Sequence, residues 1–410
     1  MAPDSPVEHL HVRRHNLSLV LRLVAAQAHR SRASIAATTG LTRATVSSLV
    51  AELIRRGLVR DLGRETDQRV GRPATLLELD GSGVVTVGVE LNVGYTSVIA
   101  NDLAGTTVYE RRRPLATASS EFETLLPLLD GEIRRAIDAA ESAGHSVAGI
   151  GVAVPGIVDA VTGVVVFAPN LGWRYVPLGD RLGAHFGSSL SIMVDNEANM
   201  GAVAEHRVGA ATGADHLVYV LAGNGVGAGV IVNGALFRGA SGAAGEIGHT
   251  TVDPAGAWCA CGSRGCWETK VGLEALLVAA VPDLAGGLLE DPRLGPEAKL
   301  ASVVARAHAG DPVALGGLAD FARWVGIGLA NVIDMYNPEV VVLAGMLPDL
   351  APWTMGEIEA TMLDNSLKES AESCRLVLST LGFSAAALGC VVRSSERLFA
   401  DPTVVPFVRM

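Results

Sequence analysis

Cysteine is scarce in this chain, with five in 410 residues, and three of the five fall between positions 259 and 266. We expect no secretory signal, because MAPDSPVEHLHVRRHN at the start carries charged side chains before any apolar run. No uninterrupted apolar run reaches the roughly 20 residues of a membrane-spanning helix. The nearest, residues 275–289, contains proline, aspartate and two glycines. These absences predict a cytoplasmic protein without a membrane partner, where clustered cysteines bind metal more often than they form disulfides.

The net charge of −11 is divided unevenly along the chain. Residues 1–72 contain twelve arginines and six acidic residues, a charge of +6, which leaves −17 for the remainder. The length predicts two or three domains rather than one core. A basic head on an acidic body favours a head that binds nucleic acid, although a basic face can also be only a solvated surface.

The head is predicted to contain a helix-turn-helix. Ser31 can cap a short helix ending near Thr38, Gly40 supplies the turn, and Thr42 can cap a second helix reaching about Arg56. An amphipathic helix over residues 16–25 precedes them. The apolar stripes of the first and last helices are Leu17, Val20, Leu21 and Val24, and Val46, Leu49, Val50, Leu53 and Ile54.

The second helix of a helix-turn-helix enters the major groove with its N-terminal residues toward the bases. Counted from Arg32, alanine at the fifth position, glycine at the ninth, valine at the fifteenth and leucine at the eighteenth fit that motif. Arg43 is the best candidate for a guanine contact. A three-helix interaction domain without DNA is the alternative. The outward-facing candidates for DNA binding are Thr42, Arg43, Ala44, Thr45, Ser47 and Ser48.

Two short β-like runs after Gly57 predict a wing hairpin. Arg69 and Arg72, between these runs, could reach phosphates or a minor groove. The alternative is that Gly-Arg-Pro at 71–73 is only a hinge to the next domain.

Beyond about residue 84, glycine- and valine-rich strands alternate with alanine- and leucine-rich helices, which is typical of an α/β fold. Residues 87–105 and 218–239 each read as strand, glycine-containing turn, strand and turn. Similar hairpins opening two halves of a domain predict a duplicated unit with a cleft between two lobes, and such clefts bind small molecules.

Carboxylate and amide side chains follow several of the apolar strands. Each one alone is more often a helix cap or turn residue, but several together suit a neutral ligand rich in hydroxyl groups, such as a sugar. They are Asn170, Asp195, Asn196, Glu197, Asn199, Glu246 and Glu268, together with the imidazole of His249.

His249, Cys259, Cys261 and Cys266 have the spacing of a metal site. Three thiolates and one imidazole suit tetrahedral Zn²⁺ and leave no open position for chemistry, so the metal is expected to be structural. A redox pair is the alternative, but the CxC spacing lacks the CxxC of thioredoxin-like sites.

The combination of GEIGH (245–249) with CACGSRGCWE (259–268) resembles the ROK family of repressors, uncharacterised reading frames and sugar kinases. The head is similar to the winged helix-turn-helix of ROK regulators. The resemblance implies an actin- or RNase-H-like two-lobed body, a monosaccharide or aminosugar effector, and a homodimer or homotetramer on palindromic operator DNA. It implies zinc ligands at His249, Cys259, Cys261 and Cys266. The implied sugar contacts are Asn196, Glu197, Glu246, His249 and Glu268, with Gly156 and Asn170 as weaker transfers.

The expected boundaries are a winged helix-turn-helix domain over residues 1–83, a first lobe over 84–200, completed by about 385–410, and a second lobe over 201–384 with the zinc loop.

Two departures from the kinases of the family predict a regulator without enzyme activity. Glu197 stands where those kinases carry a catalytic aspartate, and its extra methylene moves the carboxylate by about an ångström. Asn92 and Val93 replace phosphate-loop glycines, although the turn at 223–227 keeps its own. We therefore expect no ATP cofactor and a sugar-responsive repressor. The alternatives are a DNA-binding sugar kinase and a repressor controlled by a partner protein.

Overall fold

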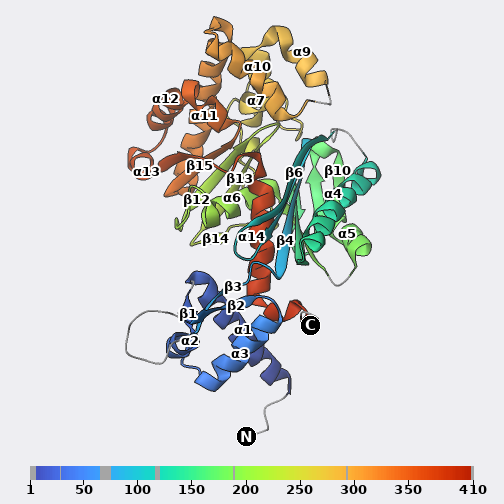
Figure 1. Ribbon diagram of the computed structural model, residues 1–410. Helices are drawn as coiled ribbons and strands as arrows, with labels where there is room; N and C mark the ends of the chain where they lie inside the picture. The colour runs from blue at the N-terminus through green and yellow to red at the C-terminus, as the bar shows by residue number, and fades with distance from the viewer. Residues whose placement is uncertain are drawn as a thin grey trace.

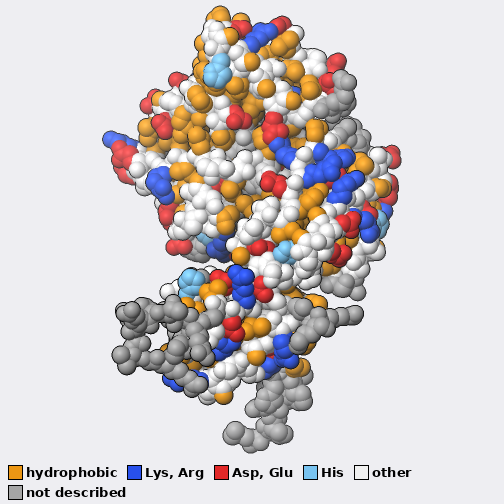
Figure 2. All heavy atoms as spheres, in the orientation of Figure 1, with side chains coloured by type: hydrophobic (Ala, Val, Ile, Leu, Met, Phe, Trp, Pro, Cys, Tyr) orange, Lys and Arg blue, Asp and Glu red, His pale blue; other side chains and the backbone are white. Residues whose placement is uncertain are grey.

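The computed structural model describes residues 6–27, 29–64, 75–115, 121–187, 190–291 and 294–407. It consists of a small head, formed by the N-terminal residues, and a larger body of two α/β lobes (Figure 1). A narrow waist separates the head from the body (Figure 2).

The head contains the predicted helix-turn-helix. Ser31 caps α2 by accepting a hydrogen bond from the backbone N–H of Ser34, and Thr42 caps α3 in the same way through Thr45. Gly40 lies between the helices with φ 72°. The first helix begins at Pro6 rather than at residue 16, and the predicted apolar stripes are buried, with Ile54 only half-buried. The elements are α1 (Pro6–Ala26), β1 (Arg30–Ser31), α2 (Arg32–Thr39), α3 (Arg43–Arg55), β2 (Val59–Arg64) and β3 (Thr75–Leu79).

The predicted wing hairpin is formed by β2 and β3, which pair antiparallel with Val59 opposite Leu79. Arg69 and Arg72 lie outside the described residues, as does the sequence at 71–73.

The two lobes repeat one topology, as the similar hairpins predicted. The first sheet has the order β11-β7-β4-β5-β6 and the second β16-β15-β12-β13-β14. In each sheet, the first three strands run parallel to one another. The fourth strand runs antiparallel to the third, and the fifth runs antiparallel to the fourth. The strands are β4 (Val84–Asn92), β5 (Gly94–Asp102), β6 (Thr107–Leu115), β7 (Ser146–Val154), β11 (Ser191–Asn196), β12 (Leu217–Ala222), β13 (Val226–Val232), β14 (Ala235–Leu236), β15 (Val340–Gly345) and β16 (Arg375–Leu378).

Additional elements surround both sheets. The first lobe adds α4 (Phe122–Ser142), α5 (Leu178–Phe186) and a small sheet of β8 (Ile157–Asp159), β9 (Val164–Ala168) and β10 (Trp173–Val176), with the short helix η1 (Pro169–Leu171). The second lobe adds η2 (Ile247–His249), α7 (Glu268–Val271), α8 (Leu273–Ala280), α9 (Pro282–Glu290), α10 (Pro296–His308), α11 (Pro312–Tyr336), α12 (Leu347–Asn365) and α13 (Lys368–Ser373).

Two helices, α6 (Glu197–Val208) and α14 (Ala385–Ala400), cross between the lobes (Figure 1). They pack against each other, α14 also against β4 and β7, and α6 against β12 and β13. The two helices approach so closely at Gly389 that a Cβ there would collide with the carbonyl oxygen of Met200. The end of the chain therefore returns to the first lobe beneath the cleft.

The head contacts the C-terminal end of α14 and the segment that follows it, which contains η4 (Pro402–Val404). The short helix η3 (Gly382–Ser384) lies just before α14. Ser18 Oγ donates to the carbonyl oxygen of Phe399 at 2.7 Å. The buried Arg56 donates to the carbonyl oxygens of Thr403 and Val405, and its guanidinium also binds Glu52. The head therefore contacts the C-terminal part of the chain at the waist.

Among the described helices, only α11 is long and apolar enough to cross a membrane by length and composition. Just over half of its most apolar window, 56%, is buried inside the protein. Phe321, Val325 and Leu329 of this helix belong to the core of the second lobe. The stretch at 275–289 is interrupted as expected, because α8 ends at Ala280 and α9 begins at Pro282.

Candidate functional site

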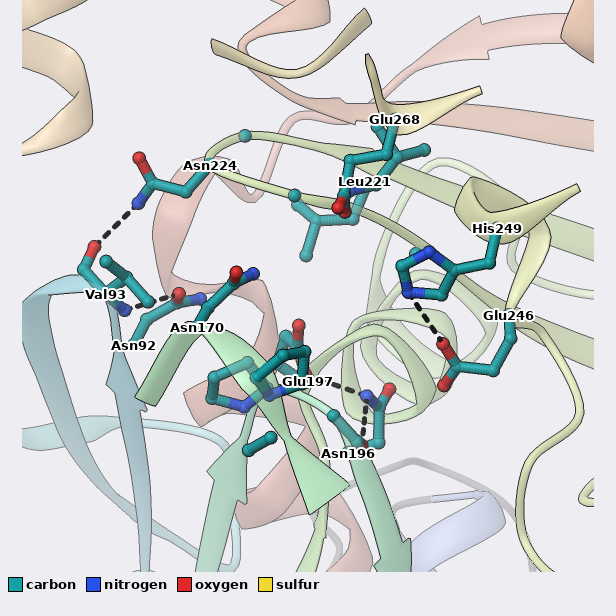
Figure 3. A pocket seen from close by; sticks show the side chains of 18 of the residues that line it. Asn92, Val93, Asn170, Asn196, Glu197, Leu221, Asn224, Glu246, His249 and Glu268 are labelled. Atoms are coloured by element: carbon teal, nitrogen blue, oxygen red, sulfur yellow. Dashed lines mark hydrogen bonds and ion pairs between the residues drawn. The ribbon is translucent and has the colours of Figure 1, made fainter. Parts of the chain in front are cut away.

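A cavity of about 330 Å³ lies between the lobes, above the N-terminal end of α6 (Figure 3). Part of its wall is formed by residues that the sequence did not single out, chiefly Tyr95, Leu221, Pro296 and Phe383. They come together only in the folded chain. The seven residues that the family resemblance implies as sugar contacts all line this cavity: Gly156, Asn170, Asn196, Glu197, Glu246, His249 and Glu268. Asp195 and Asn199, which the sequence grouped with them, do not line it.

Asn196 caps α6, so its side chain is already engaged. Its Oδ1 accepts from the backbone N–H groups of Ala198 and Asn199 at 2.8 and 3.0 Å. Its Nδ2 donates to the carbonyl oxygen of Gly156 at 3.0 Å and to Glu197 Oε2 at 2.8 Å (Figure 3). The direct effect of Asn196 is therefore to orient the Glu197 carboxyl toward the cavity.

The cavity gathers carboxyl groups that ionise less readily than usual. Burial raises the pKa of Glu197 well above its ordinary value, and the nearby Glu90, Glu246 and Glu268 raise it further. Burial also raises the pKa of Glu246. A protonated carboxyl can donate one hydrogen bond and accept others, which matches the dual character of a sugar hydroxyl.

His249 lies between Glu246 and the cysteines. Its Nε2 is 3.9 Å from Glu246 Oε2 on the cavity side, and its Nδ1 is 3.6 Å from Cys259 Sγ. One imidazole therefore faces the cavity and the cysteine cluster at the same time.

Glu268 begins α7 and has one carboxylate oxygen fixed. Its Oε2 accepts from the backbone N–H of Val226 at 2.9 Å, and its Oε1 is 3.7 Å from Cys259 Sγ. The carboxylate is thus held against the glycine-containing turn between β12 and β13, at the wall of the cavity.

The four predicted metal ligands converge. The donor atoms of His249, Cys259, Cys261 and Cys266 all lie within 4.8 Å of one another. Cys261 Sγ and Cys266 Sγ are 3.7 Å apart, close to the roughly 3.8 Å edge of a tetrahedron with Zn–S bonds of about 2.3 Å. Gly262 and Gly265, with φ of 93° and 72°, form the turns that bring the sulfurs together. The cluster can hold one metal ion.

The turn between β4 and β5 is occupied by its own side chains. Asn92 donates to Glu90 Oε1 at 2.8 Å and accepts from the Val93 N–H at 2.7 Å. Across the cleft, Asn224 Nδ2 donates to the carbonyl oxygen of Val93 at 2.8 Å (Figure 3). The turn between β4 and β5 and the turn between β12 and β13 are therefore hydrogen-bonded to each other.

The residues predicted to contact DNA lie at the exposed N-terminal end of α3. Thr42, Arg43, Ala44, Ser47 and Ser48 are exposed, and Thr45 is half-buried. Thr42 also serves as the cap of the helix. Their position leaves this end of α3 accessible to a large partner.

Two family models match the chain, one on the body and one on the head. The model described as ROK family matches residues 86–394. The chain belongs to the ROK family. The second model, the IclR helix-turn-helix domain, matches residues 17–63 of this ROK protein.

Relatives of the ROK protein include regulators and kinases. It is 32% identical to the xylose repressor of Bacillus subtilis over 380 residues, 92% of this chain and 94% of the relative. It is 33% identical to a glucokinase of Streptomyces coelicolor over 274 residues, 65% of this chain and 83% of the relative. A crystal structure of a ROK family transcriptional regulator, described as a homologue of the Escherichia coli MLC protein, is 24% identical and covers 95% of this chain and 97% of its own, with a TM-score of 0.78. The repressor likeness includes the head, whereas the kinase likeness spans only part of the chain.

Proposed function

We propose that this ROK protein is a sugar-responsive, DNA-binding transcriptional repressor. The observation that carries the proposal is the joining, in one chain, of a capped and exposed recognition helix to a cleft lined by all seven predicted sugar contacts. The likeness to a xylose repressor along both parts supports it. D-Xylose is therefore the first effector to test, with D-glucose and N-acetylglucosamine beside it.

The proposed DNA complex contains a homodimer or homotetramer on a palindromic operator. Two α3 helices, about one helical turn apart, would enter successive major grooves, with Arg43 directed at a guanine. The exposed end of α3 supports this arrangement.

The proposed effector site lies between Glu197 on the first-lobe side and Glu246, His249 and Glu268 on the second. A sugar there would stabilise one arrangement of the lobes. To release the operator, it must bind the DNA-incompetent arrangement more tightly, by about 2–3 kcal/mol for a useful switch.

The proposed metal is a structural Zn²⁺ held by His249, Cys259, Cys261 and Cys266. The donor set supports zinc because three thiolates and an imidazole complete its tetrahedral shell. When bound, the ion would cross-link the loop between η2 and α7. His249 would then present Nε2 to the cavity in a fixed orientation, since its Nδ1 faces the cluster.

We propose further that the protein has no kinase activity and needs no ATP. Glu197 in place of the aspartate of family kinases supports this, as does the hydrogen bond from Asn224 to Val93 between the two turns. The glucokinase likeness favours the second candidate, a DNA-binding sugar kinase. A coupled ATPase assay with the three sugars separates the two, and turnover abolished by Glu197→Gln would establish the kinase.

The main experiment is a thermal-shift screen of the three sugars, repeated with operator DNA in a gel-shift assay. We expect one sugar to raise the melting temperature and to release the operator. Operator binding that no sugar changes, together with loss of binding when a partner protein is added, would instead support control by that partner.

A further inference from the structure

A second cavity, of about 740 Å³, adjoins the sugar cavity at Ile157 and also lies between the lobes. On the first lobe its wall is formed by β8 and β11, and on the second by residues 238–243, which follow β14. Asp195 and Arg238 both line it and contact each other. Neither residue lines the sugar cavity, so neither is a sugar contact.

Arg238 and Asp195 form a two-pronged ion pair. The NH1 group of Arg238 donates to Asp195 Oδ1 at 2.8 Å, and NH2 donates to Oδ2 at 2.5 Å. Asp195 is fully buried, and the side chain of Arg238 is 27% exposed. Parallel N–H···O bonds of this kind fix orientation as well as distance, since the planar guanidinium matches the carboxylate.

On the first-lobe side, this pair is attached to the turn that carries Asn196 and Glu197. Asp195 Oδ1 also accepts from the backbone N–H of Asn196 at 2.9 Å and from Asn199 Nδ2 at 3.4 Å. The carboxylate that receives Arg238 therefore also holds the start of α6, from which Glu197 points into the sugar cavity.

On the second-lobe side, the pair is attached to the loop that leads to Glu246. The carbonyl oxygen of Arg238 accepts from the Ala244 N–H at 3.2 Å and closes the loop into a turn. A Cβ at Gly242 would lie 2.8 Å from the carbonyl oxygen of Val158, so the loop packs closely on β8. Glu246 follows two residues after Ala244.

We propose that Arg238 is a positioning residue of the sugar site. Its ion pair with Asp195 holds the loop that carries Glu246 in register with the turn that carries Glu197. The proposal rests on the proposed function, because it assigns a role in sugar binding. It concerns a residue that does not touch the sugar and acts through the two carboxyl groups on either side of it.

A purely stabilising role would not need this geometry. Replacing a buried ion pair with a neutral pair of similar size is often tolerated, whereas removing one partner leaves an uncompensated charge. A neutral pair, Asp195→Asn with Arg238→Gln, should therefore fold. Arg238→Lys keeps the charge but loses the planar fork. Both variants therefore change the orientation of the contact without leaving Asp195 as an unpaired buried charge.

The experiment measures D-xylose affinity by calorimetry for the wild type, Arg238→Lys and the neutral pair, with melting temperature and bound zinc as folding controls. Arg393→Lys is the matched control, because Arg393 lines the same cavity and pairs with Glu396 rather than Asp195. We expect at least a tenfold loss of affinity in both test variants, no more than a twofold change in the control, and unaltered zinc content.

A double-mutant cycle with Glu246→Gln tests whether Arg238 acts through the loop. If it does, Arg238→Lys should lower sugar affinity far less in the Glu246→Gln protein than in the wild type. Additive losses, or wild-type affinity in Arg238→Lys, would overturn the inference alone. If D-xylose, D-glucose and N-acetylglucosamine all fail to bind the wild type, the proposed function fails and this inference with it.

Discussion

Glu90 has a carboxyl group whose two hydrogen-bond donors bind the same oxygen. Asn92 and the hydroxyl of Tyr95 both donate to Oε1, at 2.8 and 2.5 Å. Oε2 has no hydrogen-bond partner within the described part of the chain. Burial raises the pKa of Glu90 to about 7, against the opposing effect of the two donors. The folded protein therefore holds this proton more tightly than the unfolded chain does.

This shift predicts a pH dependence of stability. The contribution is complete below the unfolded pKa of about 4.5 and is lost as pH rises through the folded value of about 7, because the unfolded chain ionises first. Glu90→Gln removes the titration. Its stability relative to the wild type should rise by on the order of 3 kcal/mol between pH 4.5 and 8, because the folded pKa of about 7 lies above the unfolded value of about 4.5.

Urea denaturation of both proteins at several pH values measures this difference. Glu359→Gln, on an exposed position of α12, is the control and should run parallel to the wild type. A constant difference between wild type and Glu90→Gln across the range would mean that Glu90 ionises alike in both states.

The three clustered cysteines lie in the loop between η2 and α7. We predict that Cys261→Ser lowers bound zinc from about one ion per chain to near zero and lowers the melting temperature, because metal binding contributes directly to folding. It should also weaken sugar binding, since His249 belongs to both sites. Cys374→Ser, outside the cluster, should retain the metal. Zinc analysis and calorimetry on both variants decide, and a metal-free Cys261→Ser protein with full sugar affinity would disconnect the two sites.

Arg43 lies at the exposed N-terminal end of α3. Arg43→Ala should weaken operator binding by about 1–3 kcal/mol, the usual contribution of a two-pronged arginine–guanine contact, and should relax specificity at one base pair. Arg22→Ala, on an exposed position of α1, removes the same charge from another part of the head. Gel shifts on operator and mutated operator compare them. Equal losses in both variants would assign Arg43 a general electrostatic effect.

Local signals predicted the elements well where a cap or a turn marks them. Ser31, Gly40 and Thr42 defined the helix-turn-helix because capping depends on neighbours three residues away. The cysteine spacing predicted a convergent cluster because its four ligands lie close together in the sequence. The pairing of Arg238 with Asp195 was not predictable, because it depends on how two lobes meet. The start of α1 at Pro6 was missed because the residues before 16 lack an apolar stripe.

The whole molecule links its cleft to its head through α14. This helix packs on α6 at the base of the sugar cavity, and the segment after it binds the head through Arg56. We predict that Arg56→Met leaves sugar binding intact but reduces the release of operator by sugar. It should also speed proteolysis at the waist, because a buried cation and its hydrogen bonds are lost.

Limited proteolysis and sugar titrations of the operator complex test this coupling. Arg14→Met, which removes an exposed ion pair with Asp401 at 3.3 Å, is the matched control and should behave as the wild type. If Arg56→Met still released the operator at the wild-type sugar concentration, the signal would have to reach the head by another route.

The joint at the waist also limits how this protein can be recombined. The head lies at the beginning of the chain, but its supporting surface is formed by residues 399–405, near the other end. A chimera that exchanges only the first eighty or so residues between two ROK regulators would set a foreign head on an unmatched support. The head and residues 399–405 must therefore change together in evolution, or be transplanted together, for a new head to respond to the cleft of the protein that receives it.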